Sequence, residues 1–406
     1  MRISPLRRLA TMAAALGLTS LGLLGAGAAP AQAAISDCPS GYFCAWKSDN
    51  GTGTMFKTNT DKATLGTWDD TFRSVVNHTN KYVCLYDEPN HDQAGGAAVW
   101  DPDPAGTEWG YSHGTVSSVK FVLTSRECAY RPYPQWYSTP TPQAAGFGDL
   151  NGDRRADVLV RDKAGRLWFL PGDGTGKLVG TSGWNVFNGL VRHGDFSGDG
   201  REDVIARETA TGKLWLYPGT GTGTLGARKL IGNGGWNAMS RLVGYGDLSG
   251  DGRTDLLAVE KSTGRLWLYP GTGSGTPGAR KLIGNGGWNA VNALVGAGDM
   301  NGDGRPDLIA REPSTGKLWL YPGRTGSLGA RVPVGSGGWN VMADFLGLGD
   351  VTGDGLGDLA TTTHSDFVGD GCRGVGCQLG YQGRGDGTLD PGQVVSDDWH
   401  HLNGVF

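Results

Sequence analysis

The strongest constraint on this chain is a nine-residue phrase, D-x-[N/S/T]-G-D-x-x-x-D, that occurs five times. Its copies begin at Asp149, Asp195, Asp247, Asp299 and Asp350, so the phrase recurs every 46 to 52 residues. A fixed period of this size is typical of a stack or ring of equivalent units, each too small to bury its own apolar face. We therefore expect this region to fold as repeated units.

Within one unit, the spacing of apolar residues indicates strands. In the third copy, residues 241–246, 256–259, 265–269 and 279–283 form short apolar segments separated by glycine-containing turns. Four antiparallel strands joined by tight turns and repeated radially are the pattern of a β-propeller blade. No segment shows helical periodicity, so the sequence predicts an all-β chain with a five-bladed β-propeller over residues 144–406.

The last repeat departs from this pattern. Residues 361–378 form a glycine-rich insertion in place of a short hairpin, and residues 399–406 align with the entry strand of another blade. A strand from this segment would complete the first blade from the far end of the chain and latch the ring. Closing the ring in this way would leave only short sheet edges.

The first segment, Met1–Ala33, is predicted to be a secretory signal peptide. It combines Arg2, Arg7 and Arg8 with a small-residue apolar run, and it ends at an A-x-A cleavage site, Ala31–Ala33. No later segment is long enough to span a membrane, so we expect a secreted, extracellular protein. The net charge of −4 gives no electrostatic reason to expect nucleic acid as a partner.

Six cysteines follow the predicted signal peptide. An even number in an exported chain favours disulfides, although the sequence alone allows many pairings. We expect the pairs Cys38–Cys44, Cys84–Cys128 and Cys372–Cys377. Metal ligation is less favoured, because no C-x-x-C spacing with nearby histidines occurs.

The aspartate phrase carries oxygen ligands at the spacing that a calcium ion needs. In the copy from Asp299, oxygens of Asp299, Asn301, Asp303 and Asp307 can converge on one ion while Gly302 lets the backbone turn. The alternative is a set of aspartate-capped turns satisfied by backbone amides. Five copies that each crowd three carboxylates favour calcium, because such clusters are costly without a cation.

These loops resemble the FG-GAP or VCBS-type repeats of secreted and integrin-like propellers, in which the equivalent oxygens bind calcium. The resemblance implies five structural calcium ions. It assigns the ligand role to Asp149, Asn151, Asp153 and Asp157; Asp195, Ser197, Asp199 and Asp203; Asp247, Ser249, Asp251 and Asp255; Asp299, Asn301, Asp303 and Asp307; and Asp350, Thr352, Asp354 and Asp358. Arg154 replaces a glycine of the other four copies, so the turn of the first loop is in question.

A Trp-Asn pair that follows glycine marks the end of each of the first four units. These pairs are Trp184 and Asn185, Trp236 and Asn237, Trp288 and Asn289, and Trp339 and Asn340. An exposed indole can stack on a sugar ring while the amide binds its hydroxyls, and the G-G-W-N phrase resembles the five-bladed lectins of tachylectin type. The alternative, which we favour, is a tryptophan packed between blades as core.

Residues 35–128 precede the repeats and lack their period. Two loosely similar halves open at Cys38–Trp46 and at Tyr82–Asn90, and each leads to a serine-bearing strand. They resemble the paired Greek keys of the βγ-crystallin fold, and the opening C-P-x-G-x-x-C is similar to small secreted inhibitors of metalloproteases with that fold. Residues 129–143 are rich in proline and are predicted to be a semi-rigid linker.

The sequence contains neither H-E-x-x-H nor G-x-S-x-G, and its histidines are scattered, so we do not expect an enzyme. We expect a secreted binding protein in which a calcium-stabilised propeller carries a peptidase inhibitor module. The alternative is a lectin-like propeller that binds carbohydrate or a cell surface, with a purely structural N-terminal module. The candidate partners are accordingly a secreted metalloprotease and a glycan or cell-surface protein.

Overall fold

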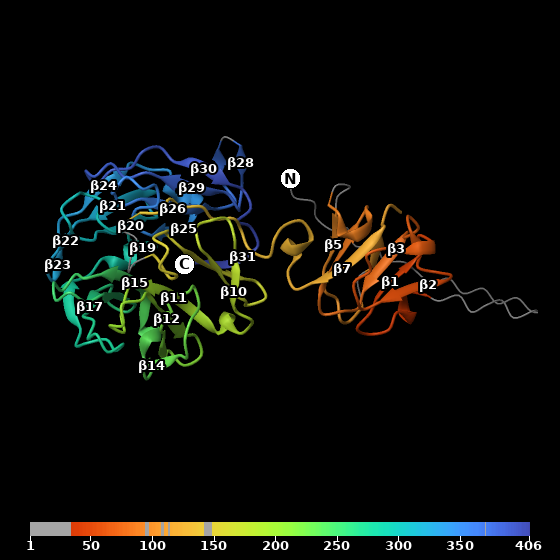
Figure 1. Cartoon of the computed structure of the whole chain (residues 1–406), viewed down its shortest axis with the longest axis horizontal. Coiled ribbons are helices and arrows are strands. Elements are labelled where there is room, and N and C mark those ends of the chain that lie inside the picture. The colour runs from red at the N-terminus through yellow and green to blue at the C-terminus, as the bar shows by residue number, and fades with distance from the viewer. Residues whose placement is uncertain (1–33, 94–96, 107–108, 113, 142–147, 370) are drawn as a thin grey trace, which may run out of the picture.

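The computed structural model describes residues 34–93, 97–106, 109–112, 114–141, 148–369 and 371–406. The predicted signal peptide and the last two residues of the predicted linker lie outside this range. Figure 1 shows two bodies, an N-terminal module and a ring of sheets. The regular elements of the described residues are strands and short 3₁₀ turns, which confirms the all-β prediction. Among these residues there is no apolar helix of membrane-spanning length.

The N-terminal module consists of two antiparallel sheets. The first has the strand order β2-β1-β3-β6 and the second β5-β4-β7. Their strands are β1 (Phe43–Trp46), β2 (Met55–Thr58), β3 (Ser74–Asn77), β4 (Tyr82–Tyr86), β5 (Ala97–Trp100), β6 (Trp109–Tyr111) and β7 (Ser118–Val122). The 3₁₀ turns are η1 (Ile35–Asp37), η2 (Gly66–Trp68), η3 (Pro89–His91) and η4 (Ser125–Cys128).

The two halves of the module exchange strands, as in the predicted βγ-crystallin-like Greek key. Strand β6 of the second half pairs with β3 of the first. In return, Lys62 of the first half forms a bridge to Val119 of β7. Because each sheet contains chain from both halves, neither half is complete alone.

Disulfides join the three cysteine pairs that the sequence predicts. Two of them, Cys38–Cys44 and Cys84–Cys128, lie in the module. The third, Cys372–Cys377, lies in the irregular insertion of the last repeat.

The C-terminal region is the predicted five-bladed β-propeller, and each blade is a four-stranded antiparallel sheet. Blade 1 contains β8 (Val158–Asp162), β9 (Leu167–Leu170) and β10 (Lys177–Gly180); blade 2 contains β11 (Phe187–His193), β12 (Asp203–Glu208), β13 (Leu214–Tyr217) and β14 (Lys229–Gly232). Blade 3 contains β15 (Met239–Gly246), β16 (Asp255–Glu260), β17 (Leu266–Tyr269) and β18 (Lys281–Gly284).

Blades 4 and 5 each carry a small extra ribbon. Blade 4 contains β19 (Ala293–Gly296), β20 (Leu308–Glu312), β21 (Lys317–Tyr321) and β24 (Val332–Gly335), with the ribbon β22 (Gly323–Arg324) and β23 (Ser327–Leu328). Blade 5 contains β25 (Met342–Gly347), β26 (Leu359–Thr363), β29 (Gln378–Tyr381) and β30 (Gln393–Ser396), with the ribbon β27 (Val368–Gly369) and β28 (Cys372–Arg373). The turns η5 (Trp184–Val186), η6 (Trp236–Ala238), η7 (Trp288–Ala290) and η8 (Trp339–Val341) connect successive blades.

The end of the chain closes the ring, as the sequence predicts. Strand β31 (Leu402–Val405) pairs antiparallel with β8 and becomes the fourth strand of blade 1. The C-terminus consequently lies at the middle of the ring (Figure 1). A central cavity of about 380 Å³ is lined by residues of all five blades, with a large apolar side chain from each. These side chains are Leu190, Leu242, Leu294, Phe345 and Phe406.

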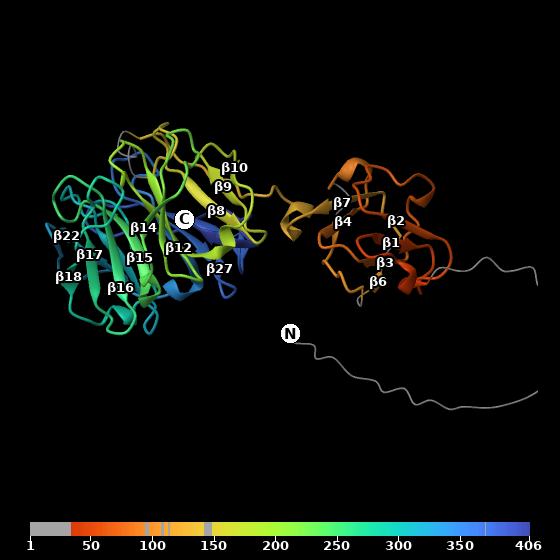
Figure 2. The same cartoon turned by 90° about the horizontal axis from the view of Figure 1, so that it is seen from below.

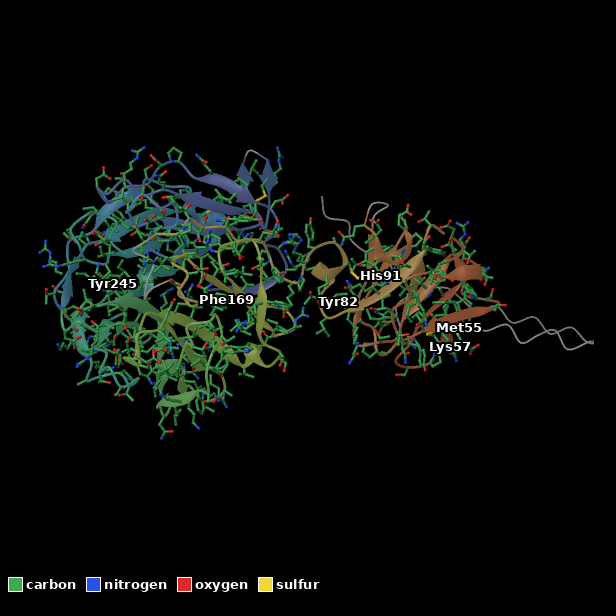
Figure 3. The ribbon with its side chains drawn as sticks, in the orientation of Figure 1. Met55, Lys57, Tyr82, His91, Phe169 and Tyr245 are labelled. Carbon is green, nitrogen blue, oxygen red and sulfur yellow. A yellow bond between two sulfur atoms is a disulfide. The ribbon has the colours of Figure 1, made fainter. Side chains whose placement is uncertain are left out.

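Apolar side chains fill the spaces between neighbouring blades. Phe169 of blade 1 is packed with Leu190, Val204 and Ala206 of blade 2, and Tyr245 of blade 3 belongs to a cluster that reaches blade 4. Figure 3 labels Phe169 and Tyr245 within the propeller. Each blade therefore buries its faces against its neighbours, which explains why a single repeat is not expected to fold alone.

The proline-rich segment between the two bodies is built into the propeller. Trp136 and Thr141 are 2% and 1% exposed. The backbone N–H of Ser138 donates to the carbonyl of Gly172 in blade 1 at 3.0 Å, and that of Thr139 donates to Val351 in blade 5 at 2.9 Å. This part of the segment is therefore held in the junction between the first and last blades, which we call the seam.

The module also contacts the propeller directly beside the seam, and Figure 2 shows the two bodies joined there from a second direction. Arg126 on η4 is 2% exposed, and its Nη2 donates to Oδ2 of Asp398 at 3.2 Å. Its Nη1 donates to the carbonyl of His400 at 3.3 Å. The neighbouring Glu127 pairs with Arg166 of blade 1 at 2.8 Å. These bonds attach the module to both ends of the propeller chain.

Substitution Arg126→Ala should lower the thermal stability of the full-length protein. The substitution leaves the partly buried Asp398 carboxylate without its cationic partner. Loss of one member of a buried ion pair costs about 3 kcal/mol. Differential scanning calorimetry measures the change. Arg384→Ala, which breaks the exposed pair with Asp390, is the control and should cost less than about 1 kcal/mol. Equal effects of the two substitutions would contradict the role of Arg126.

Candidate functional site

The five aspartate loops open at one end of the propeller. In blades 2 to 5 each loop joins the first strand to the second, and in blade 1 it leads directly into β8. In blade 3, for example, the loop connects β15 to β16 and its closing residue, Asp255, is the first residue of β16. A rigid strand therefore fixes one side of each loop.

The first aspartate of each loop organises the turn through backbone amides. In blade 3, Oδ1 of Asp247 accepts bonds from the N–H groups of Gly250 and Asp251 at 2.7 and 3.1 Å. Its Oδ2 accepts a bond from Gly252 at 2.7 Å. The other four loops repeat the bonds from the fourth and sixth residues. These are the aspartate-capped turns that the sequence left open as an alternative, and they leave the carboxylate fixed in place.

The closing aspartate connects the loop to a second turn of its own blade. Asp255 is fully buried, and its Oδ2 accepts bonds from Leu248 and Ser249 at 3.0 and 2.6 Å. Its Oδ1 accepts a bond from the N–H of Gly271 at 2.9 Å. The equivalent glycine bonds occur at Asp203, Asp307 and Asp358. Burial raises the pKa of each of these carboxyls, and that of Asp307 reaches about 6.

The first loop differs at the same position. Asp157 is fully buried, and its Oδ1 has no hydrogen-bond partner among the described residues. Burial raises the pKa of Asp157 to about 8, although the nearby Arg192 acts in the opposite direction. A buried carboxylate oxygen without a hydrogen-bond donor is costly, so a nearby cation or protonation of Asp157 would stabilise this loop.

The carboxylates fit a hard cation such as calcium. In blade 3, one oxygen each of Asp247, Asp251 and Asp255 lies within 4.8 Å of the other two. Oxygens at this spacing can contact a single ion whose ligand distances are about 2.3–2.6 Å. Asp247 and Asp255 are oriented by backbone amides, whereas Asp251 is exposed at the rim of the loop. Among the described residues, the other four loops do not bring three carboxylates this close together.

Each loop is also hydrogen-bonded to a neighbouring segment of the ring. The carbonyl of its second residue accepts a hydrogen bond from a glycine in the outer hairpin of the following blade. The donor and acceptor pairs are Gly223 to Leu150, Gly275 to Phe196, Gly326 to Leu248, and Gly387 to Met300. In the fifth loop, the carbonyl of Val351 instead accepts a bond from the N–H of Thr139, which belongs to the proline-rich segment held in the seam (residues 136–141, here called the seam segment). A change in the shape of one loop is therefore transmitted to the adjacent blade.

The four Trp-Asn pairs lie between blades. Each indole packs on a tyrosine of the next blade, with ring centroids 4.7 to 4.8 Å apart. Those partners are Tyr217, Tyr269, Tyr321 and Tyr381. Each asparagine amide donates to a backbone carbonyl of a hairpin, at Lys163, Thr209, Lys261 and Pro313. The indoles thus make the interblade contacts that core packing requires, and each amide bonds to a hairpin of the preceding blade. A sugar-binding role for the pairs stays a prediction.

Sequence reasoning missed two parts of this site. In blades 2 to 4 the glycines that bond to the closing aspartates belong to a Pro-Gly pair, so a repeated signal was present; in blade 5 the glycine is Gly383, which follows Gln382. The role of Thr139 had no such signal, because the seam segment occurs once and its proline content indicated a linker. Only the folded ring brings that segment beside the fifth loop.

Comparison with known families supports both parts of the chain. Residues 31–99 match the model of peptidase inhibitor family I36. Residues 195–258, 247–310 and 299–361 match the model of an FG-GAP-like repeat. These matches include four of the five aspartate loops, and the first loop lies outside them.

Solved structures similar to this chain share little sequence with it. A lectin of Agrocybe aegerita that recognises non-reducing terminal N-acetylglucosamine is 17% identical, with 89% of this chain and 91% of that chain covered and a TM-score of 0.38. The Tc holotoxin pore of Photorhabdus luminescens is 17% identical over 63% of this chain and 11% of its own, with a TM-score of 0.34. A luciferin-regenerating enzyme is 10% identical over 66% and 79%, with a TM-score of 0.37.

At these TM-scores the neighbours carry no argument about function. No curated protein matches the chain. The two family matches fit a non-enzymatic binding protein with a peptidase inhibitor domain followed by FG-GAP-like repeats.

Substitution Arg154→Gly should stabilise the propeller. Arg154 keeps the turn of the first loop but adopts a φ of 67°, where the next four loops place glycine. A side chain there costs about 1–2 kcal/mol, partly offset by the greater freedom of glycine in the unfolded chain, so we expect a net gain of about 0.5–1 kcal/mol. Thermal denaturation measures it. The reciprocal change Gly252→Arg in blade 3 should destabilise the protein, and a gain from both substitutions would contradict this explanation.

Proposed function

We propose that this chain is a calcium-stabilised binding protein whose N-terminal module inhibits a peptidase. The match of residues 31–99 to peptidase inhibitor family I36 is the observation that carries this proposal. A compact module of two strand-exchanged sheets with two disulfides supports it, because a rigid inhibitor loses little conformational entropy when it binds.

The surface that we assign to the peptidase lies along β6, an edge strand of the first sheet. Trp109 and Tyr111 on this strand are 41% and 67% exposed, and their rings meet edge to face at 5.3 Å. Exposed aromatic side chains of this kind commonly dominate the affinity of protein interfaces. An edge strand also offers unpaired backbone groups to an extended partner.

The full-length protein should inhibit one or more secreted zinc metalloproteases at micromolar concentration or below. The double substitution Trp109→Ala and Tyr111→Ala should weaken inhibition about 100-fold, because truncation of each central aromatic residue typically costs about 1–2 kcal/mol. Inhibition constants for the wild type and the variant measure this effect.

Lys57→Ala on β2 is a matched control, since Lys57 is exposed on the same sheet but away from β6. It should leave the inhibition constant unchanged. Failure of the wild-type protein to inhibit any of a set of secreted zinc metalloproteases at micromolar concentration would overturn the inhibitor assignment.

For the propeller, we propose that the aspartate loops hold calcium. In blade 3 the ligands would be Asp247, Ser249, Asp251 and Asp255, and the corresponding residues would serve in the other loops. A bound ion would supply the positive charge that the carboxylate cluster of blade 3 lacks. The chain itself orients the first and closing aspartates through backbone amides and ties each loop to the next blade. Binding therefore has a direct route to the stability of the ring.

Chelation of calcium should lower the melting temperature of the propeller. At about 1 mM calcium, a site with a dissociation constant of about 10⁻⁴–10⁻³ M adds roughly 0.4–1.4 kcal/mol of stability. Asp251→Asn should reduce the calcium-dependent increment by about one such site. In the presence of a chelator, the same substitution should stabilise the protein slightly because it removes carboxylate repulsion.

The effect of Asp251→Asn on stability therefore changes sign between calcium and chelator. Loss of a turn without ion binding would lower stability under both conditions. Asp386→Asn, in an outer hairpin of blade 5, is the control and should behave alike with and without calcium. A melting temperature that is identical in calcium and in chelator would refute the proposed sites. Calorimetry detects the reversal without any assay of activity.

A further inference from the structure

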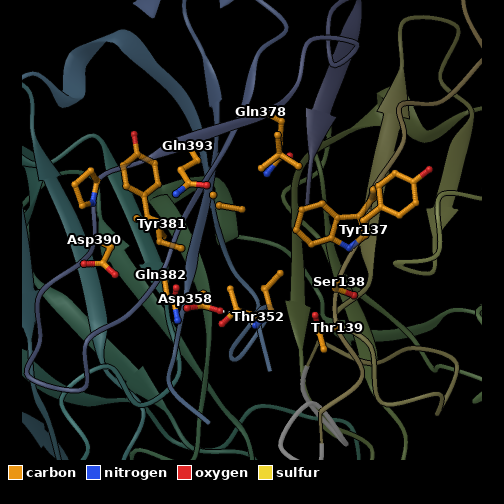
Figure 4. A pocket seen from close by; sticks show the side chains of 17 residues that line it. Tyr137, Ser138, Thr139, Thr352, Asp358, Gln378, Tyr381, Gln382, Asp390 and Gln393 are labelled. Atoms are coloured by element: carbon orange, nitrogen blue, oxygen red, sulfur yellow. Dashed lines mark hydrogen bonds between the residues drawn. The ribbon is translucent and has the colours of Figure 1, made fainter. Parts of the chain in front are cut away.

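A pocket of about 460 Å³ lies at the seam, and Figure 4 shows Thr352 and Asp358 among the residues that line it. Gly380 and Gln378 also line it, at positions where blades 2 to 4 have buried leucines. Because Thr352 and Asp358 belong to the fifth aspartate loop, the seam pocket is part of the site already described. The central cavity, by contrast, shares no residue with the aspartate loops.

The central cavity combines an apolar wall with a polar rim. Leu242, Leu294 and Phe345 contribute to the wall, and the exposed Asn188 and Asn292 lie at the rim. The innermost strands of blades 2 to 5 begin at the interblade turns and end at the aspartate loops, so the two asparagines mark the end of the ring opposite those loops. A volume of about 380 Å³ falls within the roughly 300–1,000 Å³ typical of small-molecule sites.

Arginines surround this end of the ring, and three of them are engaged by backbone carbonyls. Arg161, Arg207 and Arg311 occupy equivalent positions on the strand next to the innermost one, in blades 1, 2 and 4. The Nη1 atom of each donates to two carbonyls in or directly after the turn that enters the next blade. These bonds satisfy the guanidinium groups and hold neighbouring blades together.

Blade 3 reverses this arrangement. Val259 occupies the position of the arginine, and its partner on the innermost strand β15 is Arg241. The corresponding partners are Gly189 in blade 2 and Ala293 in blade 4. Blade 3 therefore carries its arginine on the innermost strand, where those two blades have a small residue. As a result, Arg241 lines the central cavity.

The charge of Arg241 is not neutralised by the protein. Its guanidinium makes no ion pair or hydrogen bond within the described part of the chain, and burial alone lowers the pKa of Arg241. Among the described residues that line the cavity, the one carboxylate is that of Asp344, which accepts a bond from Thr362 at 2.8 Å and interacts with Arg311. A partly buried charge without a counter-ion is destabilising, so an anion beside Arg241 would be favoured.

We propose that the central cavity binds a small organic carboxylate with an apolar body. The carboxylate would pair with Arg241, because a planar guanidinium can donate to both of its oxygens. The apolar body would pack against Leu242, Leu294 and Phe345. A free carboxylic acid and the C-terminal residue of an apolar peptide share this chemistry. The site uses no residue of the aspartate loops, of β6 or of the Trp-Asn pairs, so it is independent of the peptidase and calcium proposals.

Two substitutions of Arg241 test the role of its charge. Arg241→Gln removes the charge and keeps a long polar side chain, whereas Arg241→Lys keeps the charge but loses the two-pronged geometry. Arg265→Gln, at an exposed position of the same blade, is the matched control. All three variants should fold with melting temperatures close to that of the wild type, because Arg241 has no partner to lose and blade 4 has alanine at the equivalent position.

Binding is measured by calorimetric titration of the full-length protein in calcium with hexanoate, phenylacetate and N-acetyl-leucine. Acetate lacks the apolar body and hexanamide lacks the charge. We expect the wild type to bind at least one of the three probes with a Kd of about 1 mM or lower, and to bind acetate and hexanamide at least about tenfold more weakly. Arg241→Gln should weaken binding of the probe about tenfold or more, Arg241→Lys should weaken it less, and Arg265→Gln should leave it unchanged.

The choice of probe distinguishes the two sources of the ligand. Binding of N-acetyl-leucine but not of hexanoate or phenylacetate would assign the cavity to the end of a peptide, and the opposite preference would assign it to a free acid. Absence of wild-type binding to all three probes at millimolar concentration would overturn the inference. Binding that Arg241→Gln leaves unchanged, or hexanamide binding as tight as that of hexanoate, would do the same. Peptidase inhibition and the calcium-dependent melting temperature should be equal in Arg241→Gln and the wild type, so failure here is distinguishable from failure of the proposed function.

Discussion

The arrangement of the propeller depends on hydrogen bonds that tie the aspartate loops of blades 2 to 4 to two hairpins each. Within a blade, the closing aspartate accepts a bond from a Pro-Gly turn, as Asp255 does from Gly271. Between blades, the carbonyl of the second loop residue accepts a bond from the next hairpin, as Leu248 does from Gly326. Because these bonds recur around the ring, the position of one blade fixes that of the next, and closure depends on the last junction.

That last junction has a different construction from the others. Strand β31 completes blade 1, and Thr139 donates the bond that a hairpin glycine donates elsewhere. Arg126 then attaches the N-terminal module to Asp398 at the same place. The module, the seam segment and the C-terminal strand therefore meet at the seam.

Residues that recur in every blade make contacts within the propeller. Residues that break the repeat do not make those contacts. The repeated tryptophans pack on tyrosines of the next blade, and the repeated asparagines bond to hairpins. Gly380 and Gln378 break the pattern and line a pocket at the seam. Trp109 and Tyr111 lie in the module, outside the repeat altogether, and they are exposed. Binding sites in a repeat protein of this kind are therefore best sought at residues that depart from the repeat.

The sequence by itself determined the all-β class, the number of blades and the closing strand, because a fixed period and local turn residues report on contacts within and between identical units. It favoured the three disulfide pairs without excluding other pairings. It also identified the loops that suit calcium. Tertiary structure alone decided that the proline-rich segment lies in the seam and that Arg126 holds the module there. It likewise decided that a pocket opens beside Gly380. These contacts join segments that occur once and lie far apart in the chain, so no periodic signal in the sequence records them.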